Sequence, residues 1–441
     1  MEEKKLLIVT QHFWPEAFRV NDLAAGFIER GYEVDVLCGL PNYPKGEWFS
    51  GYRYTGPRRE THDGVNIIRA GEIRRKGNTG ARIFLNYVSW PVCAVFNLWR
   101  LKGPYTAVLC YNTSPVLMNL PAIVYAKLHK VPLTSYVLDI WPENLYSVLP
   151  VKNRFLRGVA HWVSDWHYRR CDRLIAISES LRRRLCERTD KPEAAVAVIP
   201  QHCEDFYAVP IHDETLAARF AGRFNLVFTG NFSPAQSLET VIKAAVKARA
   251  VGAQALRLVL VGDGMSADSL KALAEELNAG DTVEFWPSVP PERVPAYTAL
   301  ADALKALAKE LDAGDTVEFW PSVRPEQVPA YTALADGLVA SLSDTEDLGM
   351  TVPAKIASYM AAAKPLLASM DGEGAAAVAE AGCGFVSAAE DVDALAANMA
   401  ALCAASPDER AEMGRRAFAY YETHYRRRAV LDRLEEFISA R

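Results

Sequence analysis

Short apolar runs of strand length alternate with helical patterns along almost the whole 441-residue chain, and this alternation limits the possible folds more than any other feature. The runs are nearly continuous in hydrophobicity, which is typical of parallel strands buried on both faces. Parallel strands need helical crossovers, so the pattern predicts a doubly wound α/β fold. The expected strands are Leu6–Thr10, Val34–Cys38, Val65–Ala70, Ala107–Asn112, Leu133–Asp139, Arg173–Ser178, Val196–Pro200, Asn225–Asn231, Leu256–Gly264, Thr282–Trp286, Gly337–Ser343, Pro365–Met370 and Gly384–Ser387.

The alternation breaks once, around Gln201–Pro210, and then starts afresh. A chain of this length exceeds what one hydrophobic core usually organises. We therefore predict two doubly wound, Rossmann-like domains over residues 1–205 and 206–424, followed by an amphipathic helix within 425–441. Ligands of such sheets bind at the carboxyl ends of the strands, so a cleft between the two domains is the expected site.

An internal duplication interrupts the second domain. Residues 270–302 recur as 304–336 with four changes, and each copy reads as one α-β-α unit. Two copies are too few for a solenoid, so a local tandem duplication is the better explanation. We expect the second copy to add an edge strand, Thr316–Trp320, and one long helix to join the copies. The alternative places the second copy's strand in the third position of the sheet and leaves the first copy peripheral.

Composition narrows the class of protein. A net charge of −5 and a pI near 6.0 argue against a nucleic-acid-binding protein. Eight cysteines without metal-ligand spacing indicate reduced, buried thiols in a cytoplasmic protein. The N-terminus has no signal-peptide pattern. The apolar segment Ile83–Trp99 is interrupted by Asn86 and Pro91, so we interpret it as a helix with a strongly apolar face and not as a membrane span.

The stretch Gly349–Pro365 has the pattern of an anion site. A glycine turn leads into a helix, where free backbone N–H groups and the helix dipole favour a phosphate, and Lys355 would add a positive charge. The alternative is an ordinary amphipathic helix with Lys355 in solvent.

Other candidates follow strands. Arg19 comes after the first strand, where it could meet a negative group or simply lie on the surface. Asp139 and Glu143 surround a Trp-Pro pair and suit the hydroxyls and ring of a sugar, although Asp139 could instead cap the next helix. In the second domain, Gly230-Asn231 forms a turn before a helix. The match to GxGxxA beginning at Gly262 is a weak dinucleotide signal, because that fingerprint belongs to the first strand of its unit.

These residues together resemble the GT-B glycosyltransferases of family 4, in particular a subgroup that assembles bacterial polysaccharides such as colanic acid and O-antigens. The resemblance covers nearly the whole chain. It rests on the segments TQHFWPE, LPNYPKGEWFSGY, DIWPE, CDRLIAISESLRRRL, IPQHCEDFY, TGNFSPAQSLETVIKAA, VGDG and VPAKIASYMAAAKPLLAS.

The resemblance implies a nucleotide-sugar donor held by the second domain, with a UDP-sugar expected, and an acceptor held by the first. It also implies retention of anomeric configuration, no obligatory metal, no cofactor, and a C-terminal helix that crosses back to the first domain. The two-glutamate signature of the family is absent, because Met350 and Ser358 occupy its two positions. The donor-binding residues carried over or proposed are Arg19, Gly230, Asn231, Gln236, Gly262, Asp263, Gly264, Val289, Val323, Gly349, Met350, Thr351 and Ser358.

We therefore predict a retaining glycosyltransferase that moves a sugar to a lipid-linked or saccharide acceptor. The proposed catalytic residues are Lys355, which stabilises the leaving diphosphate, and Asp139 and Glu143, which orient the sugar. Basic and aromatic residues in 74–100 and 154–170 favour an anionic membrane surface, at the inner face of the cytoplasmic membrane. The alternatives are a GT-B-fold sugar-nucleotide epimerase and an inactive binding or scaffold protein.

Overall fold

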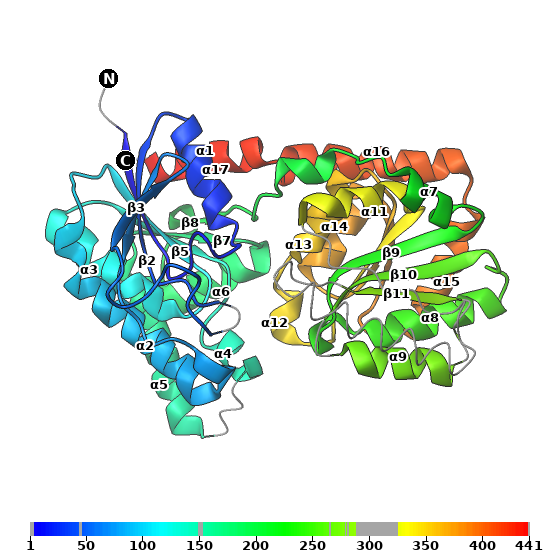
Figure 1. The fold of residues 1–441 in the computed structure, drawn as a ribbon, viewed down its shortest axis with the longest axis horizontal. Helices are drawn as coiled ribbons and strands as arrows, with labels where there is room; N and C mark the ends of the chain where they lie inside the picture. Colours follow the sequence, from blue (N-terminus) through cyan, green and yellow to red (C-terminus); the bar gives the residue numbers. More distant parts are fainter. Residues whose placement is uncertain are drawn as a thin grey trace. The chain divides into compact units, whose positions relative to one another are not determined.

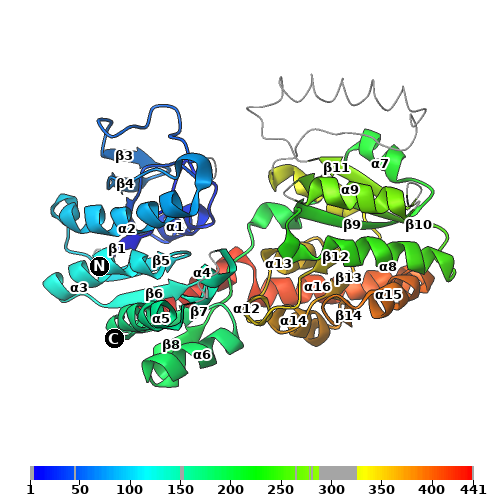
Figure 2. The same cartoon turned by 90° about the horizontal axis from the view of Figure 1, so that it is seen from below.

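The computed structural model describes residues 4–43, 46–148, 153–263, 266–277, 279, 282–287 and 325–439. By its contacts the chain divides into two compact units. The first contains residues 1–200 and returns at 430–441, and the second contains residues 201–429. Figures 1 and 2 show a sheet with helices on both of its faces in each unit, and the strands are parallel except at one edge of the first sheet. The prediction of two Rossmann-like α/β sheets is confirmed.

The first unit is built on an eight-stranded sheet in the order β3-β4-β2-β1-β5-β6-β7-β8. Helices α1 and α17 cover one face of this sheet, and α2, α3 and α5 cover the other (Figure 1). The elements are β1 Lys5–Val9, α1 Val20–Glu29, β2 Glu33–Cys38, β3 Arg59–His62, β4 Val65–Arg69, η1 Lys76–Asn78, α2 Gly80–Phe96, η2 Leu98–Arg100, β5 Ala107–Asn112, η3 Val116–Met118, α3 Asn119–His129, β6 Leu133–Val137, α4 Glu143–Val148, α5 Arg154–Arg170, β7 Arg173–Ala176, α6 Glu179–Thr189, η4 Glu193–Ala195, β8 Val196–Val198 and α17 Arg427–Ser439.

Strand β3 does not appear among the expected strands. It pairs antiparallel with β4 through a tight turn at Asp63 and Gly64, both of which have positive φ. Its sequence, RETH, is polar and at most partly buried, because it is an edge strand. A search for apolar runs therefore passes over it, whereas the Asp-Gly dipeptide is a hairpin signal.

The second unit contains a six-stranded parallel sheet in the order β11-β10-β9-β12-β13-β14. This is the 3-2-1-4-5-6 order of a doubly wound sheet, with its switch point between β9 and β12. The elements are η5 Asp205–Ala208, α7 Glu214–Phe220, β9 Phe224–Asn231, η6 Pro234–Gln236, α8 Leu238–Ala250, β10 Leu256–Asp263, α9 Ala267–Glu276, β11 Val283–Pro287, η8 Pro325–Gln327, α11 Val328–Leu334, β12 Gly337–Ser341, α12 Glu346–Gly349, α13 Ala354–Ala361, β13 Leu366–Ser369, α14 Glu373–Ala381, β14 Gly384–Ser387, α15 Val392–Ala404 and α16 Pro407–His424.

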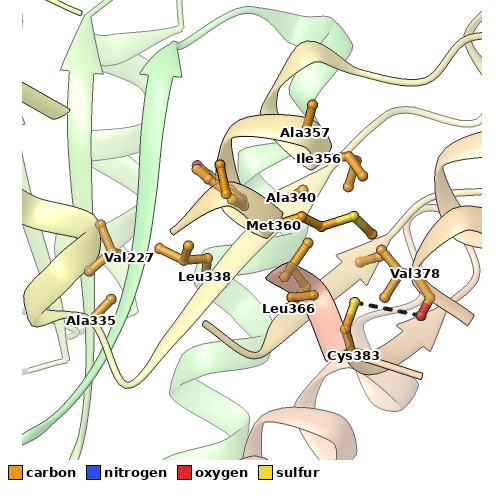
Figure 3. Packing of buried hydrophobic residues seen from close by; sticks show 14 of the residues in the cluster. Val227, Ala335, Leu338, Ala340, Ile356, Ala357, Met360, Leu366, Val378 and Cys383 are labelled. Atoms are coloured by element: carbon orange, nitrogen blue, oxygen red, sulfur yellow. Dashed lines mark hydrogen bonds between the residues drawn. The ribbon is translucent and has the colours of Figure 1, made fainter. Parts of the chain in front are cut away.

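Two hydrophobic clusters fill the two faces of the second sheet. One lies beneath α8, α9 and α15, and the other beneath α7, α11, α13, α14 and α16. Figure 3 shows part of the second cluster, in which Ile356 and Met360 of α13 pack among residues of the sheet such as Leu338 and Leu366. Both side chains are fully buried, so this face of α13 is held firmly.

Each copy of the duplicated sequence supplies different elements of the second unit. Helix α9 and strand β11 come from the first copy, whereas η8 and α11 come from the second. Since β11 pairs with β10 at the edge, the alternative that leaves the first copy peripheral is wrong. The expected extra strand, Thr316–Trp320, and the joining helix lie outside the described residues.

Candidate functional site

The carboxyl end of β9 opens away from its neighbour at the switch point of the second sheet. Strand β12 pairs with β9 only at Leu226 and Val227, so later residues of β9 need other partners. Tyr359 of α13 replaces the missing strand, because its hydroxyl accepts a hydrogen bond from Thr229 N at 2.7 Å. Helix α13 is thereby fixed against the end of β9.

This packing brings Lys355 of α13 to the end of β9. Its ammonium group donates a hydrogen bond to Oε1 of Gln236 and lies 4.3 Å from the centre of the Phe228 ring. Lys355 as a residue is partly exposed, but its amine is enclosed by these groups. Burial lowers the pKa of Lys355 to about 7, because the charged form loses water that its neighbours replace incompletely.

Two glycines make room for this lysine. Gly230 has φ +136°, and a Cβ there would lie 2.6 Å from Cε of Lys355. Gly262 is paired with Gly230 across β9 and β10, and a Cβ on it would approach Gly230 O to 1.8 Å. Gly230 and the following Asn231 are exposed. An incoming anionic group therefore has access to backbone and ammonium at one place.

The segment before α13 differs from the expectation. Gly349 ends the short helix α12 instead of starting the helix of Lys355, which begins at Ala354. The N–H groups of Gly349 and Thr351 donate to the carbonyls of Thr345 and Leu348, both at 3.1 Å, so they do not point into an open anion site. The reason is that a proline at 353 delays the next helix and leaves room for a separate turn.

Of the remaining residues predicted to bind the donor, those that the structure describes lie in or next to different elements of the two units. Met350 follows the last residue of α12. Ser358 is buried and its hydroxyl donates to Lys355 O at 3.1 Å, within α13. Arg19 lies in the first unit, at the start of α1. Asp263 is the last residue of β10, and nothing is described for its side chain. Gly264, Val289 and Val323 lie outside the described residues.

Asp139 and Glu143 follow β6 in the first unit and differ in environment. Burial raises the pKa of Asp139 to about 6, and a hydrogen bond with Asn144 opposes this rise. Asp139 therefore changes charge around pH 6 and is mostly ionised at neutral pH. Glu143 is held by two arginines of α6, at 3.1 Å from Arg188 and 3.6 Å from Arg184. These ion pairs give Glu143 a structural role in joining α4 to α6.

A buried polar network that the sequence prediction missed lies at the carboxyl edge of the first sheet. His12 Nδ1 is 2.7 Å from Oε2 of Glu16, whose other oxygen accepts the backbone N–H of Asn42 at 2.7 Å. The carboxyl group of Glu72 accepts side-chain amide hydrogens from residues 11, 42 and 86, at 2.5–3.0 Å. Arg75 completes the network. The available signal was the presence of polar residues directly after three neighbouring strands, β1, β2 and β4.

Within the described ranges, no group of three or more His, Cys, Asp or Glu side chains is arranged to hold a metal ion. A search of the same residues finds no helix with the length and hydrophobicity needed to cross a membrane.

Three family models match the sequence. The model described as glycosyl transferase 4-like domain matches residues 17–202, and two models described as glycosyl transferases group 1 match residues 217–304 and 300–405. A comparison with curated proteins gives no match.

Solved structures share the fold over almost the full length of the chain. The sucrose-phosphate synthase of Thermosynechococcus elongatus superposes with a TM-score of 0.66 at 14% identity, covering 98% of each chain. Anabaena HepE in complex with UDP and glucose gives 0.62 at 14% identity and covers 100% of each. WaaG, a glycosyltransferase involved in lipopolysaccharide biosynthesis, gives 0.63 at 14% identity and covers 99% of this chain and 100% of its own. The family models and the shared fold together support a glycosyltransferase of the GT-B type.

Proposed function

We propose that the protein is a retaining glycosyltransferase that transfers a sugar from a UDP-sugar to a lipid-linked saccharide in the synthesis of a bacterial surface polysaccharide. The observation that carries the proposal is the enclosed Lys355 at the exposed end of β9, beside Gly230. The same fold holds UDP and glucose in the Anabaena HepE structure. A lysine at the carboxyl end of a doubly wound sheet suits the diphosphate of such a donor.

The chemistry follows from the charges that develop during transfer. The bond between the anomeric carbon and the diphosphate oxygen breaks, and the acceptor hydroxyl forms the new bond on the same face of the sugar. The proton of that hydroxyl passes to the departing diphosphate. Negative charge therefore grows on the diphosphate, and a positioned ammonium group such as that of Lys355 stabilises it most in the transition state.

The first unit supplies the acceptor side in this proposal. Asp139 accepts a hydrogen bond from a hydroxyl of the acceptor sugar. Trp141, two positions later, is buried, and its indole N–H donates to Ser114 Oγ at 2.8 Å. This bond holds the segment after β6 in place.

The decisive experiment measures nucleotide release from a panel of UDP-sugars and GDP-sugars, with and without a lipid-linked saccharide. We expect UDP to appear only when both substrates are present, and nuclear magnetic resonance of the product to show the anomeric configuration of the donor. Conversion of the UDP-sugar into an isomer that still carries UDP, without any acceptor, would favour an epimerase. If no combination releases a nucleotide or yields such an isomer, the protein is an inactive binding protein. If GDP is released in place of UDP, the donor is a GDP-sugar and the proposed uridine base is wrong.

The enclosed lysine predicts a specific pH dependence of donor binding. With a pKa of about 7 for Lys355, about half of the amines carry a proton at pH 7, but only about 3% do at pH 8.5. An anion that needs the ammonium form must draw in a proton, so the dissociation constant of UDP should rise about tenfold between these values. Titration calorimetry of wild type and Lys355→Arg checks this, because an arginine stays charged throughout. Equal pH dependence in both proteins would contradict the role of Lys355.

The proposed lipid-linked acceptor agrees with two exposed apolar surfaces in the first unit. Arg82, Arg154 and Arg157 are exposed beside them, which adds the positive charge that an anionic bilayer attracts. Arg75, expected to belong to this basic surface, is instead buried. The exposed apolar side chains of α2, η2 and α5 are Phe84, Leu85, Val92, Phe96, Trp99, Phe155, Leu156, Val159 and Trp162.

Replacing two exposed aromatic residues of α5 by aspartate tests the membrane surface. Phe155 and Trp162 lie two helical turns apart and are 77% and 66% exposed. We expect wild type to float with vesicles that contain phosphatidylglycerol, and Phe155→Asp/Trp162→Asp to remain unbound, because each carboxylate opposes insertion and repels the anionic surface. Val251→Asp, at an exposed apolar position of the second unit, is the matched control and should float normally. A wild-type protein that fails to float at low salt would exclude this surface.

A further inference from the structure

Arg75 is a buried cation that lacks a carboxylate partner among the described side chains. It is 7% exposed. Its Nε donates to Oδ1 of Asn86 at 3.0 Å, and one terminal nitrogen lies 3.4 Å from Nε2 of His12. No described carboxylate comes within 4.0 Å of its guanidinium. Buried charges are normally paired, so this arrangement leaves the charge of Arg75 open to a ligand.

Another buried arginine of the same unit has its charge compensated by a carboxylate, as is usual for buried charges. Arg69 is 1% exposed, forms an ion pair with Glu60, and donates further hydrogen bonds to the carbonyls of Gly39 and Trp14. Its charge is thus compensated within the protein. Arg75 is also buried, but its described bonds go to the amide of Asn86 and the ring of His12, and no described carboxylate bonds to it directly.

Glu72 lies in the network of Arg75 but does not act as its counter-ion. Both carboxyl oxygens of Glu72 accept amide hydrogens, from Gln11, Asn42 and Asn86. Burial raises the pKa of Glu72 well above its ordinary value, which favours the neutral carboxyl group, although Arg75 itself acts in the opposite direction. The other buried carboxylate of the network, Glu16, reaches Arg75 only through the ring of His12, so no described carboxylate contacts the guanidinium directly.

Aromatic rings border the guanidinium group. The rings of Tyr43 and Tyr87 have their centres 5.4 and 4.9 Å from the central carbon of Arg75, and Trp141 meets Tyr87 edge-on with centres 6.0 Å apart. Flanking rings hold a guanidinium group in place and leave its edge for bidentate bonds to anionic oxygens. The site thus combines a fixed cation with bordering aromatic rings, of which Tyr43 is exposed.

We propose that Arg75 binds the phosphate groups that join the saccharide of the acceptor to its lipid. This inference rests on the proposed function and names the acceptor chemistry: a lipid diphosphate saccharide. In such a molecule the phosphates lie between sugar and lipid. In this chain the Tyr87 ring of helix α2 contacts the guanidinium group of Arg75, and the same helix exposes the apolar side chains of Leu85 and Val92, on which a lipid can lie.

Binding measurements on the intact protein test the site without relying on catalysis. Farnesyl diphosphate and inorganic pyrophosphate are titrated by calorimetry into wild type, Arg75→Gln, Arg75→Lys and the control Arg183→Gln, which removes an exposed arginine of α6. All four are measured in a Lys355→Met background, so that the cation beside Gly230 does not contribute. We expect Arg75→Gln to weaken the binding of farnesyl diphosphate at least tenfold, Arg75→Lys to weaken it less, and Arg183→Gln to leave the affinity within twofold.

The outcomes separate this inference from the proposed function. If Arg75→Gln binds farnesyl diphosphate as tightly as its parent and melts at the same temperature, Arg75 is not the phosphate site. If Arg75→Gln fails to fold, unchanged affinity in a folded Arg75→Lys overturns the inference, because an ammonium group cannot reproduce bidentate bonds. Pyrophosphate bound as tightly as farnesyl diphosphate would show a free-anion site and not an acceptor site. Absence of transfer with every sugar donor would sink the proposed function but leave these affinities valid.

A kinetic comparison adds a readout that a purely structural role would not move. We expect Arg75→Gln to raise KM at least tenfold for a diphosphate-linked acceptor and to leave KM within twofold for the same saccharide on a neutral alkyl chain. An equal loss with both acceptors would mean that Arg75 only supports the fold.

Discussion

Lys355→Met is expected to lower kcat/KM for transfer by about a hundredfold or more, because the variant loses the cation that stabilises the departing diphosphate. Methionine has an unbranched apolar side chain of similar length, so it can fill the space beside the Phe228 ring after the ammonium group is removed. Initial rates of UDP release at several donor concentrations measure this loss. The reduction should appear mainly in kcat, since the interaction is strongest in the transition state.

The same substitution is expected to stabilise the unliganded protein. The pKa of Lys355 is about 7 in the folded state and near 10.5 when the chain is unfolded, so the unfolded state binds more protons between these values. The wild type therefore gains stability as pH rises from 7 towards 10.5, and the variant lacks this gain. Urea unfolding should show the variant to be more stable by ~1–3 kcal/mol at pH 7, with a smaller difference at pH 9.

Lys364→Met is a matched control, because Lys364 follows the same helix and burial also lowers its pKa. It should change stability in the same direction but leave transfer intact. If Lys355→Met and Lys364→Met reduce activity alike, the effect of Lys355 comes from folding and not from the site. A destabilised Lys355→Met would show that its amine is well compensated in the folded state.

Gly230→Ala is expected to reduce transfer about a hundredfold, because the new methyl group would lie 2.6 Å from Cε of Lys355 and displace the ammonium. The φ of +136° adds backbone strain, and we expect a loss of ~1–3 kcal/mol in unfolding free energy. Kinetics and urea unfolding of one protein preparation measure both effects.

Gly252→Ala separates strain from displacement. Gly252 has φ +127°, but nothing lies within 4 Å of a Cβ placed there. This variant should lose a similar amount of stability and keep its activity. If Gly252→Ala loses activity to the same extent as Gly230→Ala, backbone strain alone explains both losses. The contact between residue 230 and Lys355 then has no effect on transfer.

The sheets were predictable because their signal is local. Runs such as Leu6–Thr10 and Asn225–Asn231 are apolar over the length of one strand, and the parallel arrangement follows from the helices between them. The polar strand β3 carries no such signal and was missed. The break in the pattern near Gln201 predicted a change of domain there, and the contacts divide the chain into two units after Pro200.

The environment of Lys355 was not predictable, because it depends on contacts between distant segments. Gln236 and Phe228 lie more than a hundred positions away in the sequence, and their enclosure of the amine changes a solvated lysine into one that titrates near neutral pH. The amides of Gly349 and Thr351 were misassigned for a related reason: a local pattern shows a helix start but not which carbonyls its N–H groups already bind.

The network around Arg75 was hidden in a similar way. It joins residues after β1, β2 and β4 with Asn86 of α2, and each of these residues is unremarkable in its own segment. Asn86 was read as an interruption of an apolar run, whereas in the fold it bridges Arg75 and Glu72. Only the order of the strands places these polar residues together.

Strand β11 comes from the first copy of the repeat and α11 from the second. Recombination between the two copies in the gene would therefore keep the coding sequence of both elements. The copies begin at Leu270 and Leu304, so recombination between them removes 34 codons in frame and joins Pro287 directly to Ser322. Helix α9, β11, η8 and α11 would all remain encoded. The number of copies could therefore rise or fall between related genomes while every described element of the second sheet stays the same.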